Sequence, residues 1–298
     1  MLNDNLKNQF HLHFIVFIWG FTALLGDLIS LQALPLVWTR ILIAIACIYG
    51  YILFKKKSIL LSGKTIARLM LYGIVIALHW FTFFYAIKVS NISITLACIS
   101  TGAFFTSLLE PIFFKRKMVW YEVFLGCLVV CGLVLIFSFE TQYIEGIIFS
   151  LISAFLSASF SIINGKLATQ HDSVIISFYE LIGGWLFLGI LMLAFGQFQW
   201  EFFQFQPLDF LWLFILGSIC TAYPFIATID IMKYLSPYTV MLSINMEPIY
   251  GTILAVLVFP EKEMMTAAFY LGALIIIGTV ILNAYFKQLS KKKLVNTK

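Results

Sequence analysis

The chain has 298 residues, of which 62% are hydrophobic and 11% are charged, whereas soluble domains are about 45–50% apolar and about 25% charged. This composition excludes an ordinary soluble enzyme and a nucleic-acid-binding domain, so no nucleic-acid partner is expected. The formal net charge of +5 is explained by lysines placed at the ends of membrane helices. Each such helix needs roughly 20 apolar residues, so ten helices take up about 200 residues and leave room for loops.

Apolar runs bounded by charged residues, proline or glycine predict ten membrane-spanning helices. Unpaired backbone is not tolerated in lipid, so helices rather than open strands must cross it. The first run continues past residue 30 without a small-residue cleavage site, which indicates a retained helix rather than a signal peptide. We therefore predict an all-α integral membrane protein. In chain order, its helices are expected at residues 12–31, 34–54, 69–87, 92–114, 119–139, 144–165, 173–195, 209–229, 237–259 and 266–286.

Lysine and arginine are unevenly distributed over the predicted loops. If the N-terminus lies inside and the helices alternate in direction, 16 of the 19 basic residues fall on the inner side. Lys88 and Lys262 fall on the outer side, and Arg40 lies within a helix. Because cytoplasmic loops carry the excess of lysine and arginine, we expect both termini in the cytoplasm. We expect a multi-pass protein of the plasma (inner) membrane.

The two halves of the sequence resemble each other. The segment AIKVSNIS at 86–93 resembles IMKYLSPY at 231–238. Further along, a pair of glycines in the first half matches a pair in the second half. These pairs are Gly126 with Gly132 and Gly272 with Gly278.

Each half holds five predicted helices, and five is an odd number, so the halves cross the membrane in opposite senses. Inverted repeats are a recurrent architecture of secondary transporters, whose substrate site lies near the bilayer midplane between the halves. We expect the first repeat at 1–140, the second at 141–286 and a basic cytoplasmic tail at 287–298.

The most specific motif is a Glu247-Pro248 pair followed by a further acid, Glu261. Together with the ten helices in two halves, this motif and four other stretches resemble the drug/metabolite transporter superfamily, specifically its EamA-like branch. The matching stretches are WGFTALLGD at 19–27, WTRILIAIA at 38–46, FYAIKVSNISITLA at 84–97, MKYLSPYTVMLSINMEPIYGTILAVLVFPE at 232–261 and YLGALIIIGTVIL at 270–282.

The resemblance implies secondary transport of small organic solutes, often export, by alternating access. It does not fix the substrate. One departure is visible in the first half, which reads STGAFFTSLLEP without a proline where the second half has Pro248. Its own Glu110-Pro111 pair comes later, so roles are not transferred to the fourth helix.

Charged residues within the predicted helices are Asp27, Arg40, Glu110, Glu180 and Glu247. Each costs roughly 2.5–3.5 kcal/mol near the bilayer centre unless it has a partner or water. The rise of a helix places Glu247 about 15 Å from the inner edge, at the midplane. His79 comes out at the same depth, whereas Glu110 lies close to the cytoplasmic rim.

The sequence allows two interpretations of the role of Arg40. Asp27 lies at a similar depth on the neighbouring helix, so an Asp27–Arg40 ion pair could join the first two helices. Alternatively, Arg40 faces the central cavity and binds a substrate carboxylate, and the two readings agree if substrate displaces Asp27. Glu180 occupies the equivalent position in the second half, but an axial separation of roughly 11 Å argues against an Arg40–Glu180 bridge.

Glu247 is the strongest candidate for function. A carboxyl at the midplane favours its neutral form, which makes it a candidate proton carrier or a ligand for a substrate ammonium. The alternative is a protonated acid hydrogen-bonded across a helix interface. Two interpretations of Glu180 have equal weight: it takes part in function, or it is a structural acid shielded by close helix packing at Gly183-Gly184.

Several aromatic and polar residues complete the predicted site, although most single aromatics of this kind serve packing. Tyr223 is followed by Pro224, which can kink its helix and free carbonyls toward a cavity. Glu247 is also the candidate proton-coupling residue. The full set of candidate substrate-binding residues is Arg40, Glu247, Glu180, His79, Trp80, Asn245, Trp19 and Tyr223.

One cation, two acids and aromatic walls suit a zwitterion such as an amino acid, or an amphipathic amine. Nucleotide sugars, an alternative within the superfamily, would ask for more buried arginine or lysine. A membrane-embedded lipid-modifying enzyme is the alternative from another class, but the sequence has no DxxD, HExxH or G-K-[ST] motif. We therefore expect a small-molecule substrate, the lipid bilayer and a proton as partners, with no catalytic residue, metal or cofactor. The oligomeric state is left open.

Overall fold

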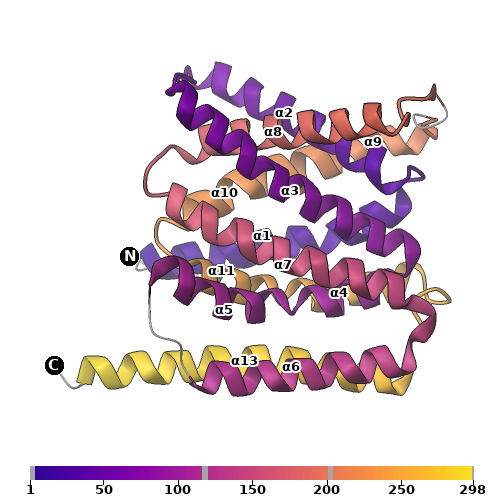
Figure 1. The fold of residues 1–298 in the computed structure, drawn as a ribbon, viewed down its shortest axis with the longest axis vertical. Coiled ribbons are helices and arrows are strands. Elements are labelled where there is room, and N and C mark those ends of the chain that lie inside the picture. The colour runs from indigo at the N-terminus through magenta and orange to yellow at the C-terminus, as the bar shows by residue number, and fades with distance from the viewer. Residues whose placement is uncertain (1–3, 116–119, 201–203, 297–298) are drawn as a thin grey trace.

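The structure is a computed structural model that describes residues 4–115, 120–200 and 204–296 (Figure 1). Within these ranges the secondary structure is helical, without a strand, and its helices follow the ten predicted segments. The first half consists of α1 (Asp4–Leu28), α2 (Ala33–Phe54), α3 (Gly63–Val89), α4 (Ile92–Ile99), α5 (Gly102–Phe114) and α6 (Trp120–Phe139). The second half consists of η1 (Thr141–Tyr143), α7 (Ile144–Leu167), α8 (Ser173–Ala194), α9 (Pro207–Gly217), η3 (Ser218–Ala222), α10 (Tyr223–Ile231), α11 (Pro237–Ile244), α12 (Glu247–Val258) and α13 (Ala267–Asn296).

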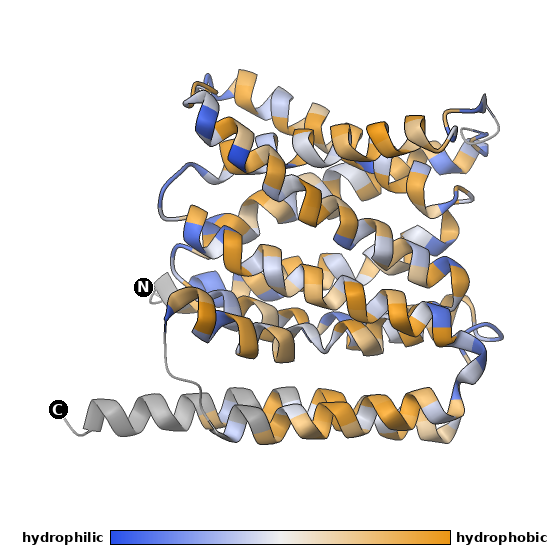
Figure 2. Cartoon of the chain, viewed as in Figure 1, coloured by the Kyte–Doolittle hydropathy of each residue, from blue (hydrophilic) through white to orange (hydrophobic). Residues whose placement is uncertain are grey.

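The lengths and apolar surfaces of these helices are those of a membrane protein. Eight helical segments among the described residues are long and apolar enough to cross a bilayer, and two shorter apolar helices lie at 124–139 and 267–279. Apolar residues cover the helices along their lengths, and hydrophilic residues concentrate at the two ends (Figure 2). The predicted all-α membrane fold of ten helices in two inverted repeats is therefore confirmed.

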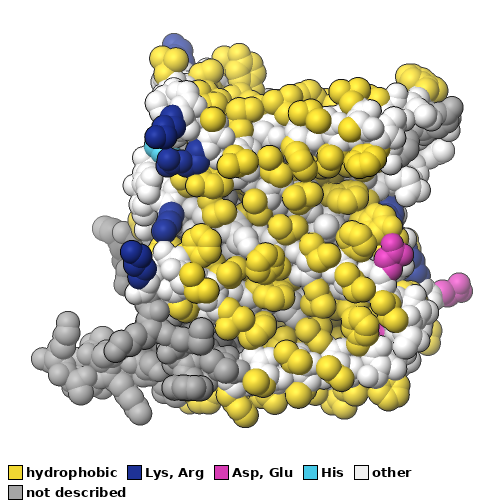
Figure 3. Space-filling view, in the orientation of Figure 1, with side chains coloured by type: hydrophobic (Ala, Val, Ile, Leu, Met, Phe, Trp, Pro, Cys, Tyr) yellow, Lys and Arg dark blue, Asp and Glu magenta, His cyan; other side chains and the backbone are white. Residues whose placement is uncertain are grey.

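The two ends of the molecule carry different charges. Lysine and arginine side chains gather at the end where both termini lie, and acidic side chains are visible at the opposite end (Figure 3). We call the first the lysine-rich end; it includes Lys55–Lys57, Lys166 and Lys233. Arg116 and Lys117, counted in the same predicted group, lie outside the described residues, as do positions 297–298 of the predicted tail. The backbone of that tail continues α13 as far as Asn296.

The two halves interlock rather than lie side by side. Helix α3 packs against both α7 and α8, α1 packs against α12, and α6 pairs with α13 at one edge of the molecule (Figure 1). Since α1 starts at the lysine-rich end and α7 at the opposite end, equivalent helices of the two halves run in opposite directions. The halves are therefore in contact both in the middle of the bundle and, through α6 and α13, at its edge.

Three segments predicted as continuous helices are interrupted. In the second half, Pro248 stands at the start of α12, and Pro224 follows the π-helical turn η3. Proline lacks the N–H that continues a helix, so these interruptions agree with the sequence. The first half has no proline at its break between α4 and α5. There, the hydroxyls of Ser100 and Thr101 bond to carbonyls of the preceding turn.

Close packing of α3 against α8 depends on glycine. A Cβ added to Gly73 would lie within van der Waals overlap of the Glu180 carbonyl oxygen, and one added to Gly184 would lie 2.7 Å from the Gly73 carbonyl oxygen. Gly183 meets the backbone of Met70 in the same way. The two helix backbones therefore touch beside Glu180, as the Gly183-Gly184 pair suggested.

Candidate substrate-binding cavity

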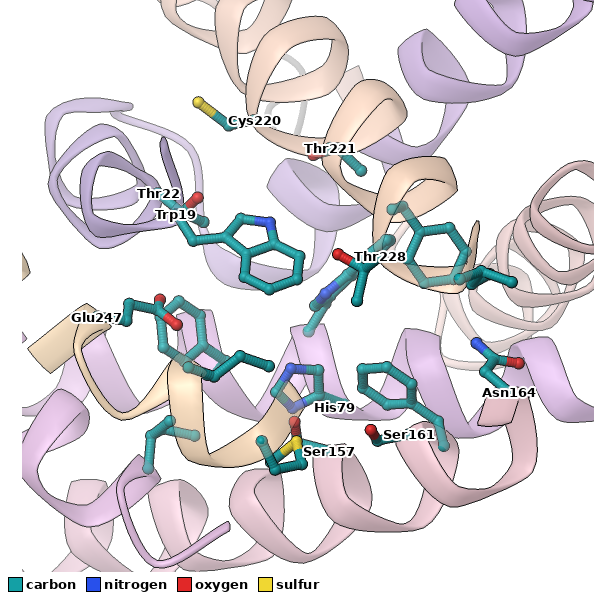
Figure 4. A pocket seen from close by; sticks show the side chains of 18 of the residues that line it. Trp19, Thr22, His79, Ser157, Ser161, Asn164, Cys220, Thr221, Thr228 and Glu247 are labelled. Carbon is teal, nitrogen blue, oxygen red and sulfur yellow. The ribbon is translucent and has the colours of Figure 1, made fainter. Parts of the chain in front are cut away.

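A cavity of about 80 Å³ lies between the two halves of the bundle. Its walls come from α1, α2, α3, α4, α7, η3, α10, α11 and α12, so both repeats contribute (Figure 4). Five of the eight predicted site residues line it. These are Trp19, Arg40, His79, Trp80 and Glu247.

Arg40 is held firmly in the cavity wall, with 2% of its surface exposed. Its Nε donates a hydrogen bond of 2.7 Å to Oγ1 of Thr221, and its Cζ lies 4.1 Å from the ring centroid of Trp80. The Thr221 hydroxyl in turn donates to the Leu216 carbonyl across the π-helical turn. One guanidinium nitrogen, Nη1, is buried without a hydrogen-bond partner. The site therefore holds an oriented cation that has no anionic partner in contact among the described residues.

The Asp27–Arg40 ion pair considered from the sequence is wrong. Asp27 instead pairs with Lys262, whose Nζ lies 2.5 Å from the Asp27 carboxylate. The physical reason is that the end of α1 meets the loop between α12 and α13, which the sequence does not place. Arg40 and Glu180 do not pair either, as their axial separation predicted. The guanidinium of Arg40 therefore pairs with neither acid and lines the cavity.

Glu247 enters the cavity from the first residue of α12, with 8% of its surface exposed (Figure 4). Among the described side chains, it forms no hydrogen bond and no salt bridge. The N-terminus of a helix favours negative charge, and Arg40 acts on Glu247 electrostatically across the cavity. The two opposite charges therefore share one cavity without neutralising each other by contact.

His79 lies in the cavity wall (Figure 4). Its Nδ1 is 2.9 Å from the Ser153 carbonyl oxygen, and the Ser153 hydroxyl donates to the His79 carbonyl. A ring nitrogen facing a carbonyl must carry the hydrogen, so in the neutral ring Nε2 is left as an acceptor. Trp19 presents its indole ring to the same space (Figure 4).

Three predicted residues lie off the cavity wall. Glu180 is fully buried behind Asn164, whose Nδ2 donates to it over 3.2 Å. Asn245 is buried at the break between α11 and α12. Tyr223 donates to or accepts from His11 Nε2 at 2.8 Å. These three side chains therefore face neighbours outside the central cavity.

Tyr223 and His11 line a second, larger cavity of about 630 Å³. It reaches toward the lysine-rich end, where Lys57 and Asp172 form a salt bridge of 2.5 Å in its wall. The segment η3 separates the two cavities, because Thr221 faces the central one and Ala222 the larger one. More open space therefore lies at the lysine-rich end than in the centre.

The polar face of α7 was missed by the sequence analysis. Ser157, Ser161 and Asn164 line the central cavity and are buried (Figure 4). A signal for them existed, because serines at helical spacing continue along one face of an otherwise apolar segment. That face comprises Ser150, Ser153, Ser157, Ser161 and Asn164.

No group of three or more His, Cys, Asp or Glu side chains that could hold a metal ion occurs within the described residues. The cavity instead offers separate charged, polar and aromatic groups. A cavity of this kind, enclosed by two inverted repeats, is typical of membrane transporters.

The sequence model of the EamA-like transporter family matches residues 11–138 and 144–285. The chain therefore belongs to the EamA-like transporter family and is a multi-pass membrane transporter of the drug/metabolite transporter superfamily, as the resemblance predicted. Membership implies a small-molecule substrate and a lipid environment.

Comparison with solved structures shows the same fold. One of 28 matching chains, titled only "Crystal structure of protein", is 15% identical and has a TM-score of 0.66. The match covers 92% of this chain and 95% of that one. At this identity the likeness describes the fold alone. No curated protein matches the chain.

Proposed function

We propose that this transporter exports small organic solutes carrying an amino group, either amino acids or amphipathic amines, by alternating access around the central cavity. One observation carries the proposal. Arg40 and Glu247 line a single aromatic cavity, and neither has an oppositely charged partner in contact. A zwitterion supplies both missing partners, since its carboxylate matches the guanidinium and its ammonium matches the carboxylate.

The aromatic walls suit the same class of solute. Trp19, Trp80 and Phe225 surround the charged groups, and Trp80 already stacks on Arg40. Aromatic faces bind cationic and apolar groups of a ligand. Arg40 is the only arginine or lysine among the described residues lining the cavity. Nucleotide sugars and other phosphorylated solutes would leave much of their charge uncompensated there.

Glu247 also supports a proton as the coupling ion. Its carboxyl has no cation in contact among the described residues, so binding a proton removes the cost of a buried charge. A substrate ammonium provides a counter-charge and makes the proton unnecessary. Proton and substrate then compete for one carboxyl, which is the requirement for exchange of one against the other.

The distribution of charge supports an orientation. Both termini and most described lysines lie at one end of the molecule (Figure 3). Under the positive-inside rule this end faces the cytoplasm of a cell whose plasma (inner) membrane holds the protein. The larger cavity then opens toward the cytoplasm, as loading for export requires. The family match in two segments also supports repeats at 1–140 and 141–286.

Counterflow in proteoliposomes tests the proposal. Vesicles holding the purified protein are loaded with one unlabelled solute and offered labelled amino acids, amines and sugars in turn. We expect exchange of one amine-containing class, competed only by its relatives and lost in Arg40→Ala. Exchange of sugars or phosphorylated solutes alone would overturn the proposed substrate class.

A further inference from the structure

Glu180 is a buried acid that the substrate site does not use. Its side chain on α8 has no exposed surface and lies where the backbones of α3 and α8 touch at Gly73 and Gly184. One amide group, that of Asn164, donates to Oε2, and Oε1 has no hydrogen-bond partner. An isolated carboxylate in such surroundings is strongly disfavoured, so this group requires a proton or a cation.

Within the part of the chain that the structure describes, the helices packed against α8 supply no cation to Glu180. None of their charged or histidine side chains forms a hydrogen bond or ion pair with it. Arg40 bonds to Thr221, His79 bonds to Ser153, and Asp230 pairs with Lys233. The ammonium of Lys166 lies over the rings of Phe113 and Phe114. The charged and histidine residues on these helices are Arg40 on α2, Lys64, Arg68, His79 and Lys88 on α3, Glu145 and Lys166 on α7, and Asp230 on α10.

Asn164 can serve both protonation states of Glu180. An ionised carboxyl needs a donor, and Nδ2 of Asn164 donates to Oε2 of Glu180 in the structure. With the carboxyl protonated, its hydroxyl needs an acceptor, and Oδ1 of the same amide has no partner. A rotation of the amide exchanges the two arrangements, because its oxygen and nitrogen ends are nearly isosteric. The pair can therefore gain or lose a proton without any other charged group.

The state of this amide is exposed to the substrate site. Asn164 lines the central cavity together with Ser161, which precedes it by one turn on α7 and also has a buried hydroxyl without an acceptor (Figure 4). When Asn164 rotates, the NH₂ group leaves Glu180 and becomes available along this wall. Protonation of Glu180 thus changes which hydrogen-bonding groups the cavity presents.

We propose that Glu180 and Asn164 form a second proton-binding site, in which Asn164 transmits the protonation state of Glu180 to the central cavity. This inference rests on the proposed transport function, in which Glu247 binds substrate directly. Glu180 acts through Asn164 and is a positioning residue. A proton taken up from cavity water adds to the carboxylate and is returned to that water when the carboxyl ionises.

Infrared spectroscopy of the purified protein tests the site without any substrate. We expect the stretching band of a protonated carboxyl in the wild type, and loss of one carboxyl contribution in Glu180→Gln. Asn164→Leu should keep that contribution but shift it, since the acceptor is gone. Glu247 contributes equally to these spectra and cancels in the differences. An unchanged spectrum in Glu180→Gln, or an unshifted band in Asn164→Leu, overturns the proposal.

Transport measurements test the coupling. In Glu180→Gln we expect counterflow within about two-fold of the wild type, and loss of accumulation driven by a pH gradient. Glu145→Gln, which neutralises an exposed acid on α7, serves as the control and should retain both activities. Accumulation by Glu180→Gln at the wild-type level, or accumulation driven by Na⁺ instead of protons, contradicts the proposal. If the wild type transports nothing, the proposed function fails while the infrared measurement still decides the proton site.

Discussion

Lys262 forms a salt bridge with Asp27 although 235 residues separate them in the sequence. The next residue, Glu263, is fully buried and accepts hydrogen bonds from the backbone N–H groups of Ile92 and Ser93, at 3.0 and 2.8 Å. The loop between α12 and α13 therefore joins the end of α1 to the start of α4. These contacts tie together the end of the molecule opposite the lysine-rich end.

The salt bridge of Lys262 and the hydrogen bonds of Glu263 should differ in their contribution to stability. Lys262 is partly exposed, so Lys262→Met should cost less than about 1 kcal/mol. Glu263→Ala leaves two buried N–H groups without an acceptor and should cost about 2 kcal/mol or more. Thermal unfolding in detergent measures both variants. Equal shifts in Tm would show that Glu263 is not the stronger contact.

Arg40 should not be replaceable by lysine. Lysine cannot donate to Thr221 through an Nε–H and at the same time place a planar group on Trp80. We expect Arg40→Lys to reduce substrate affinity at least ten-fold in a binding measurement on purified protein. Trp80→Leu removes the stacking alone, worth up to about 2 kcal/mol in a desolvated site, and should cost up to about thirty-fold. Wild-type affinity in Arg40→Lys would show that a point charge is sufficient.

Glu247→Gln should weaken the pH dependence of transport. The amide cannot bind a proton and binds an ammonium more weakly than a carboxylate does. We expect a lower rate of counterflow that changes less with pH than in the wild type, because only the contribution of Glu180 is left. Initial rates of counterflow at a series of pH values provide the measurement. Unchanged rate and pH dependence would exclude Glu247 from coupling.

The glycine at the contact between α3 and α8 should resist even a small substitution. A methyl group at Gly73 would overlap the backbone of α8, so Gly73→Ala should prevent stable packing or lower Tm strongly. Gly50→Ala on α2 is the matched control, because nothing lies within 4 Å of a Cβ there. Size-exclusion profiles and Tm compare the two. A well-folded Gly73→Ala protein would mean that the two helices can separate.

Asp172 combines two stabilising roles at the lysine-rich end. Its side chain caps α8 through the Val174 N–H and pairs with Lys57. Partial burial raises the pKa of Asp172, but the contacts with Lys57 and with the backbone N–H groups of Val174 and Ile175 outweigh it and leave the pKa below its usual value. The ionic contribution is therefore present above the unfolded-state pKa and is lost as pH falls through the folded-state pKa.

Two variants separate these roles. Asp172→Asn keeps the cap and should lower stability slightly at neutral pH, with the difference from wild type beginning to shrink below about pH 4 and vanishing only below the folded-state pKa. Asp172→Ala loses the cap as well and should cost about 1 kcal/mol more at every pH. Tm measured across this range tests both statements. A pH-independent difference for Asp172→Asn would exclude the ionic contribution.

The ten helices were predictable because hydropathy is a local property of sequence. Pro248 and Pro224 also indicated two of the three helix interruptions. The break at Ser100 was not predictable, because serine and threonine occur in continuous helices as well. Likewise, the partner of Asp27 depends on where a distant loop folds back.

The sequence predicted how far along its helix each candidate residue lies, but not which side of the helix it occupies. Counting residues placed Arg40, His79 and Glu247 at levels from which they reach the cavity. Tyr223 and Asn245 were predicted to join them, but one faces the larger cavity and the other lies buried at a helix break. Depth follows from helical rise, whereas the face of a residue follows from the packing of its neighbours. Asn164 was not predicted, because it carries no charge that would mark it within an apolar helix.

The π-helical turn η3 contributes residues to the linings of both cavities. Cys220 and Thr221 face one cavity, while Ser218 and Ala222 face the other. A π-turn contains one residue more than an α-turn needs, so conversion to α-helix would rotate Thr221 by about 100°. Such a rotation would take away the hydroxyl that orients Arg40. The geometry of the cationic group in the central cavity thus depends on a backbone turn whose other side belongs to the cavity at the lysine-rich end.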